Sequence, residues 1–112
     1  MAQLHSDLIK KTLKEFSASG LATCFRIETG VARSLDGSRI ISFGSKGMSD
    51  IIGITSNGLF ISIEIKIGRD DLREDQINFK NMIQKNKGLH YVIRNEQDLS
   101  SAISDVRHRI IA

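Results

Sequence analysis

The stretch 59–67 has leucine or isoleucine at every second position. This alternation restricts the possible folds more than any other segment does. Successive side chains of a β-strand leave opposite faces of the sheet. One face of this strand would therefore carry Ile61, Ile63, Ile65 and Ile67, and the other Phe60, Ser62, Glu64 and Lys66. The pattern predicts a strand that buries its isoleucines on one side and presents Glu64 and Lys66 together on the other.

The rest of the chain predicts further helices and strands through the spacing of its apolar residues. Amphipathic helices are expected at 4–19, 73–87 and 97–110. Strands are expected at 22–28, 50–54 and 89–94. Asp70 or Asp71 is expected to cap the second helix, and Gly88 is expected to end it.

A β-hairpin is expected where the Asp36-Gly37 pair separates 31–35 from 38–43, because this dipeptide favours two-residue hairpin turns. The expected order of elements is αββββαβα. Helices around a sheet that contains a hairpin predict an α/β fold with a mixed β-sheet flanked by helices. The lack of a βαβαβ run argues against a doubly wound fold.

Length and composition indicate one ordinary globular domain over residues 1–112. The chain is 40% hydrophobic and 26% charged, and no apolar run approaches the roughly 20 residues needed to cross a bilayer. The N-terminal residues lack the apolar stretch of a secretion signal, so a cytoplasmic location is expected. Cys24 is the single cysteine, which excludes an intrachain disulfide and a thiolate-rich zinc site. The net charge of +3 suits a polyanionic partner but is too small to establish one.

Three charged residues are expected to converge on one site. Glu64 and Lys66 leave one face of the same strand, with α-carbons roughly 7 Å apart. Asp50 opens the strand 50–54, and a tight turn expected at Asn57-Gly58 makes that strand the antiparallel neighbour of the isoleucine strand. The pairing would bring Asp50 close to Glu64.

Two carboxylates beside one ammonium predict a divalent cation, because buried carboxylates otherwise repel each other. Mg²⁺ or Mn²⁺ takes carboxylate, water and phosphate oxygens, which matches Asp50 and Glu64. The cation would activate water and polarise a phosphate. Lys66 would orient or deprotonate that water and offset charge on the phosphoryl oxygens. Phosphodiester hydrolysis is the reaction class that uses all three residues.

A Glu-x-Lys pair taken alone is usually a solvated face or an ion pair. Here the pair follows a glycine-flanked acid, Asp50, that opens a buried strand, and it lies on a strand otherwise rich in isoleucine. This rarer combination favours the catalytic interpretation.

The sequence resembles the VRR-NUC domains of the PD-(D/E)XK nuclease superfamily over nearly its whole length. The matching parts are RIETG at 26–30, KGMSDIIG at 46–53, FISIEIK at 60–66, and Gln76 with Phe79. The resemblance implies a restriction-endonuclease-like core in which Asp50, Glu64 and Lys66 are catalytic. It also implies that the main-chain carbonyl of Ile65 binds metal together with Asp50 and Glu64, and that Gln76 lies near the site.

The same resemblance implies which residues bind substrate. Arg26, Lys46 and Gln76 match the family's pattern best and are expected to contact DNA. Other basic residues could track DNA phosphates, although each one is more simply a solvated surface charge. These are Lys10, Lys11, Lys14, Arg33 and Arg39.

Two residues depart from the family's pattern. Ser49 replaces the proline that commonly precedes the acid, which should alter the rigidity of the turn more than the metal chemistry. His5 stands where the family tends to carry a glutamate, one turn before Leu8 in the first helix. We interpret His5 as a surface histidine. The alternatives are that it holds a water or a metal, or that Asp7 or Glu15 takes the place of the glutamate.

The expected function is divalent-metal-dependent cleavage of DNA. Free-standing members of the resembled family resolve four-way junctions as homodimers, which implies branched DNA as the substrate, a homodimer, and a bacterial or phage-infected host. A sequence-specific restriction endonuclease is an alternative, although this length leaves little room for base-reading elements. A non-catalytic DNA-binding module is the third hypothesis.

Overall fold

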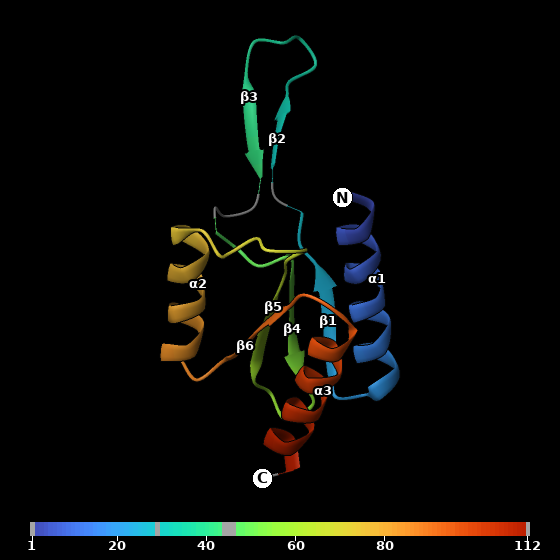
Figure 1. Ribbon diagram of the computed structural model, residues 1–112. Coiled ribbons are helices and arrows are strands. Elements are labelled where there is room, and N and C mark those ends of the chain that lie inside the picture. The colour runs from blue at the N-terminus through green and yellow to red at the C-terminus, as the bar shows by residue number, and fades with distance from the viewer. Residues whose placement is uncertain (1, 29, 44–46, 112) are drawn as a thin grey trace.

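A mixed four-stranded sheet forms the middle layer of the molecule (Figure 1). The computed structural model describes residues 2–28, 30–43 and 47–111. In spatial order the strands are β1 (Ala22–Arg26), β4 (Ile51–Thr55), β5 (Phe60–Ile65) and β6 (Leu89–Ile93). β4 is antiparallel to both β1 and β5, and β6 is parallel to β5. The predicted α/β fold with a mixed sheet flanked by helices is confirmed at this level.

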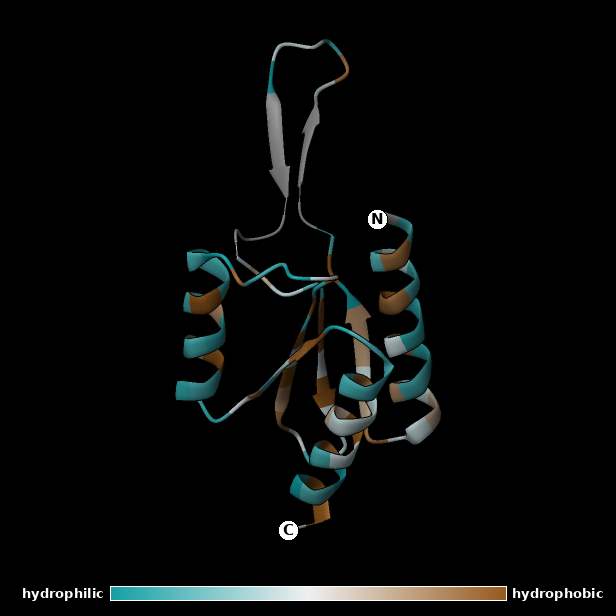
Figure 2. Ribbon diagram, in the orientation of Figure 1, coloured by the Kyte–Doolittle hydropathy of each residue, from teal (hydrophilic) through white to brown (hydrophobic). Residues whose placement is uncertain are grey.

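Helices cover the two faces of the sheet unequally. α1 (Ala2–Ser19) and α3 (Glu96–Ile111) pack on one face, and α2 (Glu74–Lys85) packs against β5 and β6 on the other. Figure 2 shows brown, hydrophobic strands lying between helices that are largely teal on their outer sides. The hydrophobic core therefore lies between the sheet and the pair formed by α1 and α3.

The alternation of β5 produces this arrangement. Ile61, Ile63 and Ile65 are at most 1% exposed and belong to the core with Phe16 of α1 and Leu99 of α3. Burying an isoleucine side chain contributes about 1.5–3 kcal/mol, so this face fixes which side of β5 turns inward. Glu64 consequently faces α2. The predicted inward position of Ile67 is wrong, because β5 ends at Ile65 and Ile67 is only half-buried in the loop that follows.

β2 (Gly30–Arg33) and β3 (Ile40–Phe43) form a separate antiparallel hairpin that projects from the body of the molecule (Figure 1). The order of elements is therefore αβββββαβα. The predicted hairpin is present, but the predicted order αββββαβα is one strand short because it counts the two hairpin arms as one. The predicted two-residue turn is also wrong. The connection spans 34–39, where Asp36 Oδ1 accepts hydrogen bonds from the hydroxyls of Ser34 and Ser38 at 2.8 and 2.6 Å.

The boundaries of α2 differ from the prediction. Arg73, not Asp70 or Asp71, is the N-cap residue, and its main-chain N–H donates to Gln76 Oε1 at 2.9 Å. The helix ends at Lys85, and the residue with positive φ after it is Lys87, at 68°, rather than Gly88. No helix of the described residues is long and apolar enough to span a membrane.

Candidate active site

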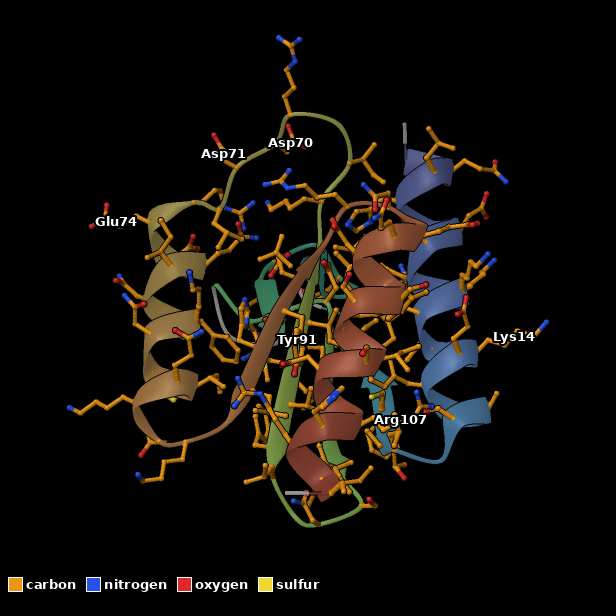
Figure 3. All side chains as sticks on the ribbon, turned by 60° about the horizontal axis from the view of Figure 1, so that its bottom comes forward. Lys14, Asp70, Asp71, Glu74, Tyr91 and Arg107 are labelled. Carbon is orange, nitrogen blue, oxygen red and sulfur yellow. The ribbon has the colours of Figure 1, made fainter. Side chains whose placement is uncertain are left out.

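A cleft of about 430 Å³ opens where the start of α1, the end of β5 and the start of α2 meet. Five of the residues expected to be catalytic or to bind metal or substrate line it: Asp50, Glu64, Ile65, Lys66 and Gln76. Asp70 also lines the cleft, and Figure 3 shows it on the loop between β5 and α2. The predicted convergence of Asp50 with Glu64 is therefore present in the structure.

Two main-chain N–H groups, one from β5 and one from the segment after β1, hold Asp50 in place. The β4–β5 register pairs Ile51 with Ile63, which brings the residue before β4 to the end of β5. There the Asp50 carboxylate Oδ2 accepts a hydrogen bond from the main-chain N–H of Ile65 at 2.8 Å. The carbonyl of Asp50 accepts another from Ile27 N–H at 2.7 Å. Backbone geometry thus positions the carboxylate before any ligand binds.

Glu64 is only 3% exposed, yet one of its carboxylate oxygens has no protein partner among the described residues. Its Oε1 accepts a hydrogen bond from Gln76 Nε2 at 3.2 Å, while the buried Oε2 is unpaired. Burial, and after it the negative charge of Asp50, raises the pKa of Glu64 to about 8. A buried carboxylate oxygen without a partner is costly, and a cation in the cleft would satisfy it.

Gln76 and Lys66 extend the site on either side of Glu64. Gln76 is 5% exposed and bridges two elements, since it accepts from the N–H of Arg73 and donates to Glu64. Lys66 is 9% exposed, and its main-chain N–H donates to the carbonyl of Ile93 at 3.1 Å. The amide of Gln76 and the mostly buried Lys66 therefore share the cleft with the carboxylates of Asp50 and Glu64.

The available donors fit a hard divalent cation. Within 2–28, 30–43 and 47–111, no three His, Cys, Asp or Glu side chains gather closely enough to form a metal site alone. A cation here would need the carbonyl of Ile65 and water or phosphate oxygens besides Asp50 and Glu64. Mg²⁺ and Mn²⁺ are commonly held in this way, by one or two carboxylates with waters and substrate oxygens.

His5 belongs to the site, contrary to its interpretation as a surface histidine. Its imidazole Nε2 lies 3.0 Å from the carbonyl oxygen of Ile65 and 3.6 Å from Asp50 Oδ2. The side chain is 37% exposed and lines the cleft from α1. Sixty residues separate His5 from Ile65, so only the packing of α1 on the sheet brings them together.

Of the described residues expected to bind substrate, only Gln76 lines the cleft. Arg26 is the last residue of β1, is exposed and pairs with Ile51, so it lies near the site without lining the cleft. Lys46 lies outside the described residues. Arg73 was not expected, yet it lines the cleft at the start of α2 with a largely exposed guanidinium. Its location at a helix start offered no sequence signal, because an N-cap is normally a small polar residue.

Comparison with known proteins gives no family assignment. The chain matches no protein-family model, and no curated protein is significantly similar to it in sequence. Functional inference for this chain therefore depends on the chemistry of the cleft.

Proposed function

We propose that the protein is a divalent-metal-dependent endonuclease that hydrolyses DNA phosphodiester bonds, with a restriction-endonuclease-like core of the VRR-NUC type. The observation that carries the proposal is the unpaired, buried Glu64 Oε2 next to Asp50 and the Ile65 carbonyl. These oxygens suit Mg²⁺ or Mn²⁺. The ammonium of Lys66 supplies positive charge to offset the negative charge that develops on the phosphate.

Each residue has a distinct role in this proposal. A bound divalent cation supplies Lewis-acid activation of water and of the scissile phosphate. Asp50 and Glu64 hold the cation, and Gln76 fixes the orientation of Glu64 through its hydrogen bond. The Lys66 ammonium contacts the phosphoryl oxygens, where charge grows as the water oxygen bonds to phosphorus and an ester oxygen leaves. Arg73 at the rim binds a neighbouring phosphate.

The hairpin β2–β3 is the proposed element that binds DNA next to the scissile phosphate. The molecule measures 53 × 30 × 25 Å, and the hairpin projects from the end of the body that carries the cleft (Figure 1). Its sequence holds Arg33 and Arg39 and one acid, Asp36. A two-stranded ribbon fits the major groove of duplex DNA. We therefore assign to the hairpin the contact with the duplex arm next to the scissile phosphate, and take branched DNA as the substrate.

A homodimer is part of the proposal, because two cuts in branched DNA need two active sites. On its face of the sheet, α2 packs mainly against β5 and β6. Phe25 of β1 and Ile54 of β4 consequently stay 58% and 52% exposed. This uncharged sheet area is compatible with its own copy across a two-fold axis, because neither copy brings a charge that would be buried unpaired. We place the contact between the two copies there.

The decisive test is cleavage of linear duplex, single-stranded, flapped and four-way DNA, each with and without Mg²⁺ or Mn²⁺. We expect cation-dependent cutting that is fastest on four-way DNA. Lys66→Met should reduce the cleavage rate roughly 100-fold or more while leaving DNA binding largely intact. Lys85→Ala is the matched control, because Lys85 is an exposed lysine at the far end of α2.

Other outcomes would distinguish the alternatives. Cutting of one defined duplex sequence, with branched DNA ignored, would favour a restriction endonuclease. DNA binding without cleavage under every cation condition would contradict the enzyme and favour a binding module.

A further inference from the structure

The histidine in the cleft lies where a metal ligand would lie. His5 Nε2 is 3.0 Å from the Ile65 carbonyl oxygen and 3.6 Å from Asp50 Oδ2. The three atoms come from α1, β5 and the segment before β4, and all three residues line the same cleft. The unpaired Oε2 of Glu64 is buried in the same cleft.

These separations match those between neighbouring ligands of one cation. Adjacent ligands of an octahedral cation with bonds of 2.0–2.1 Å lie about 3 Å apart. The separation of His5 from Ile65 already has this value, and that from Asp50 exceeds it slightly. As they stand, the side chains of His5, Asp50 and Glu64 do not gather closely enough to hold a cation. The partly exposed imidazole would have to rotate about its side-chain bonds to reach bonding distance.

We infer that His5 is a metal ligand that makes this cleft prefer Mn²⁺ to Mg²⁺. The inference rests on the proposed cation site and adds a fourth protein ligand to it. Mg²⁺ strongly favours oxygen ligands, whereas imidazole nitrogen binds transition-metal cations well. Without a cation, Nε2–H donates to the Ile65 carbonyl; binding a cation requires the other tautomer, whose proton on Nδ1 frees the lone pair of Nε2.

Calorimetric titration of the DNA-free protein with Mn²⁺ and, separately, with Mg²⁺ tests the inference without reference to activity. His5→Ala should raise the Kd for Mn²⁺ at least tenfold and change the Kd for Mg²⁺ less than threefold. His5→Glu supplies an oxygen ligand in place of the imidazole. It should restore tight cation binding and reduce the difference between the Kd values for Mn²⁺ and Mg²⁺. His108→Ala is the control, because His108 is an exposed histidine on α3, outside the cleft.

Nuclear magnetic resonance gives an independent measurement on the wild-type protein. Substoichiometric Mn²⁺ should broaden the His5 imidazole resonances beyond detection, while those of His108 remain sharp. Unchanged His5 resonances, or an equal loss of Mn²⁺ and Mg²⁺ affinity in His5→Ala, would overturn the inference. The circular dichroism spectrum of His5→Ala should match the wild type, because the side chain is partly exposed and lies outside the core.

The two proposals fail in distinguishable ways. If the wild-type protein binds neither cation, both the nuclease and the role of His5 are wrong. If Mn²⁺ supports DNA cleavage and binds equally well without His5, only the inference about His5 is wrong.

Discussion

His90 on β6 is a half-buried histidine that takes no part in the proposed chemistry. A hydrogen bond of 2.7 Å joins its Nδ1 to the hydroxyl of Ser62, and its Nε2 is buried without a partner among the described residues. Burial, and after it the positive charge of Lys80, lowers the pKa of His90 to about 4. The folded protein therefore keeps this imidazole neutral where an unfolded chain would protonate it.

The protein should lose stability below pH 6.5 because of His90. The unfolded state binds a proton near pH 6.5 and the folded state only near pH 4, so the free energy of unfolding falls between these values, by up to about 1.4 kcal/mol per pH unit. His90→Asn keeps a polar group near Ser62 and cannot titrate, so its urea-unfolding free energy should fall less over this window. His108→Gln, at an exposed histidine, should behave like the wild type. Identical slopes for wild type and His90→Asn would contradict this account.

Some site residues could be predicted from the sequence because local rules determine their positions. Alternation placed Glu64 and Lys66 together, and the short turn before β5 brought Asp50 to the same end. His5 and Arg73 could not be assigned in this way. The contact of His5 depends on how α1 packs on the sheet, which no local pattern encodes.

At the scale of elements, a described residue on each side of the projecting hairpin β2–β3 is held to the body. Before it, Ile27 N–H donates to the carbonyl of Asp50. After it, Gly47 has a φ of 83° and packs so closely on α2 that an added Cβ would lie 2.4 Å from the carbonyl oxygen of Asp75. Only glycine fits this contact. Both contacts lie next to the cleft residues Met48 and Asp50.

The double variant Arg33→Ala, Arg39→Ala should bind four-way DNA several-fold more weakly than the wild type. Removing two phosphate contacts should also reduce the slope of log affinity against log salt concentration by about two. Fluorescence anisotropy over a salt series measures both quantities. Lys85→Ala, Arg107→Ala removes the same charge from exposed positions outside the hairpin and should change neither. An equal loss of affinity in the two double variants would show that only net charge matters.

Sequence patterns predicted the helices and central strands better than their junctions. Apolar spacing located α1, α3 and β4 to within a few residues, because burial of those apolar residues determines where these elements form. The hairpin turn and the start of α2 were predicted wrongly. In both places side-chain hydrogen bonds determine the geometry, through Asp36 in the turn and Gln76 in the helix.

For the whole molecule, the exposed sheet area around Phe25 and Ile54 predicts the oligomeric state. Light scattering during gel filtration should give twice the 12.5 kDa mass of one chain. The double variant Phe25→Glu, Ile54→Glu should be monomeric, because burying glutamates in the contact is costly. Leu4→Glu changes an apolar side chain on α1 that is 56% exposed and should remain dimeric. A monomeric wild type, or a double variant that stays dimeric, would place the contact elsewhere or remove it.

The double anchoring of the hairpin has a consequence for how this protein could be re-engineered. Since Ile27 and Gly47 are each held to the body, we expect that segment 30–43 can be exchanged without displacing the proposed cation ligands. Segment 30–43 is thus a grafting position, where arms of other length or charge could change which DNA the proposed nuclease binds.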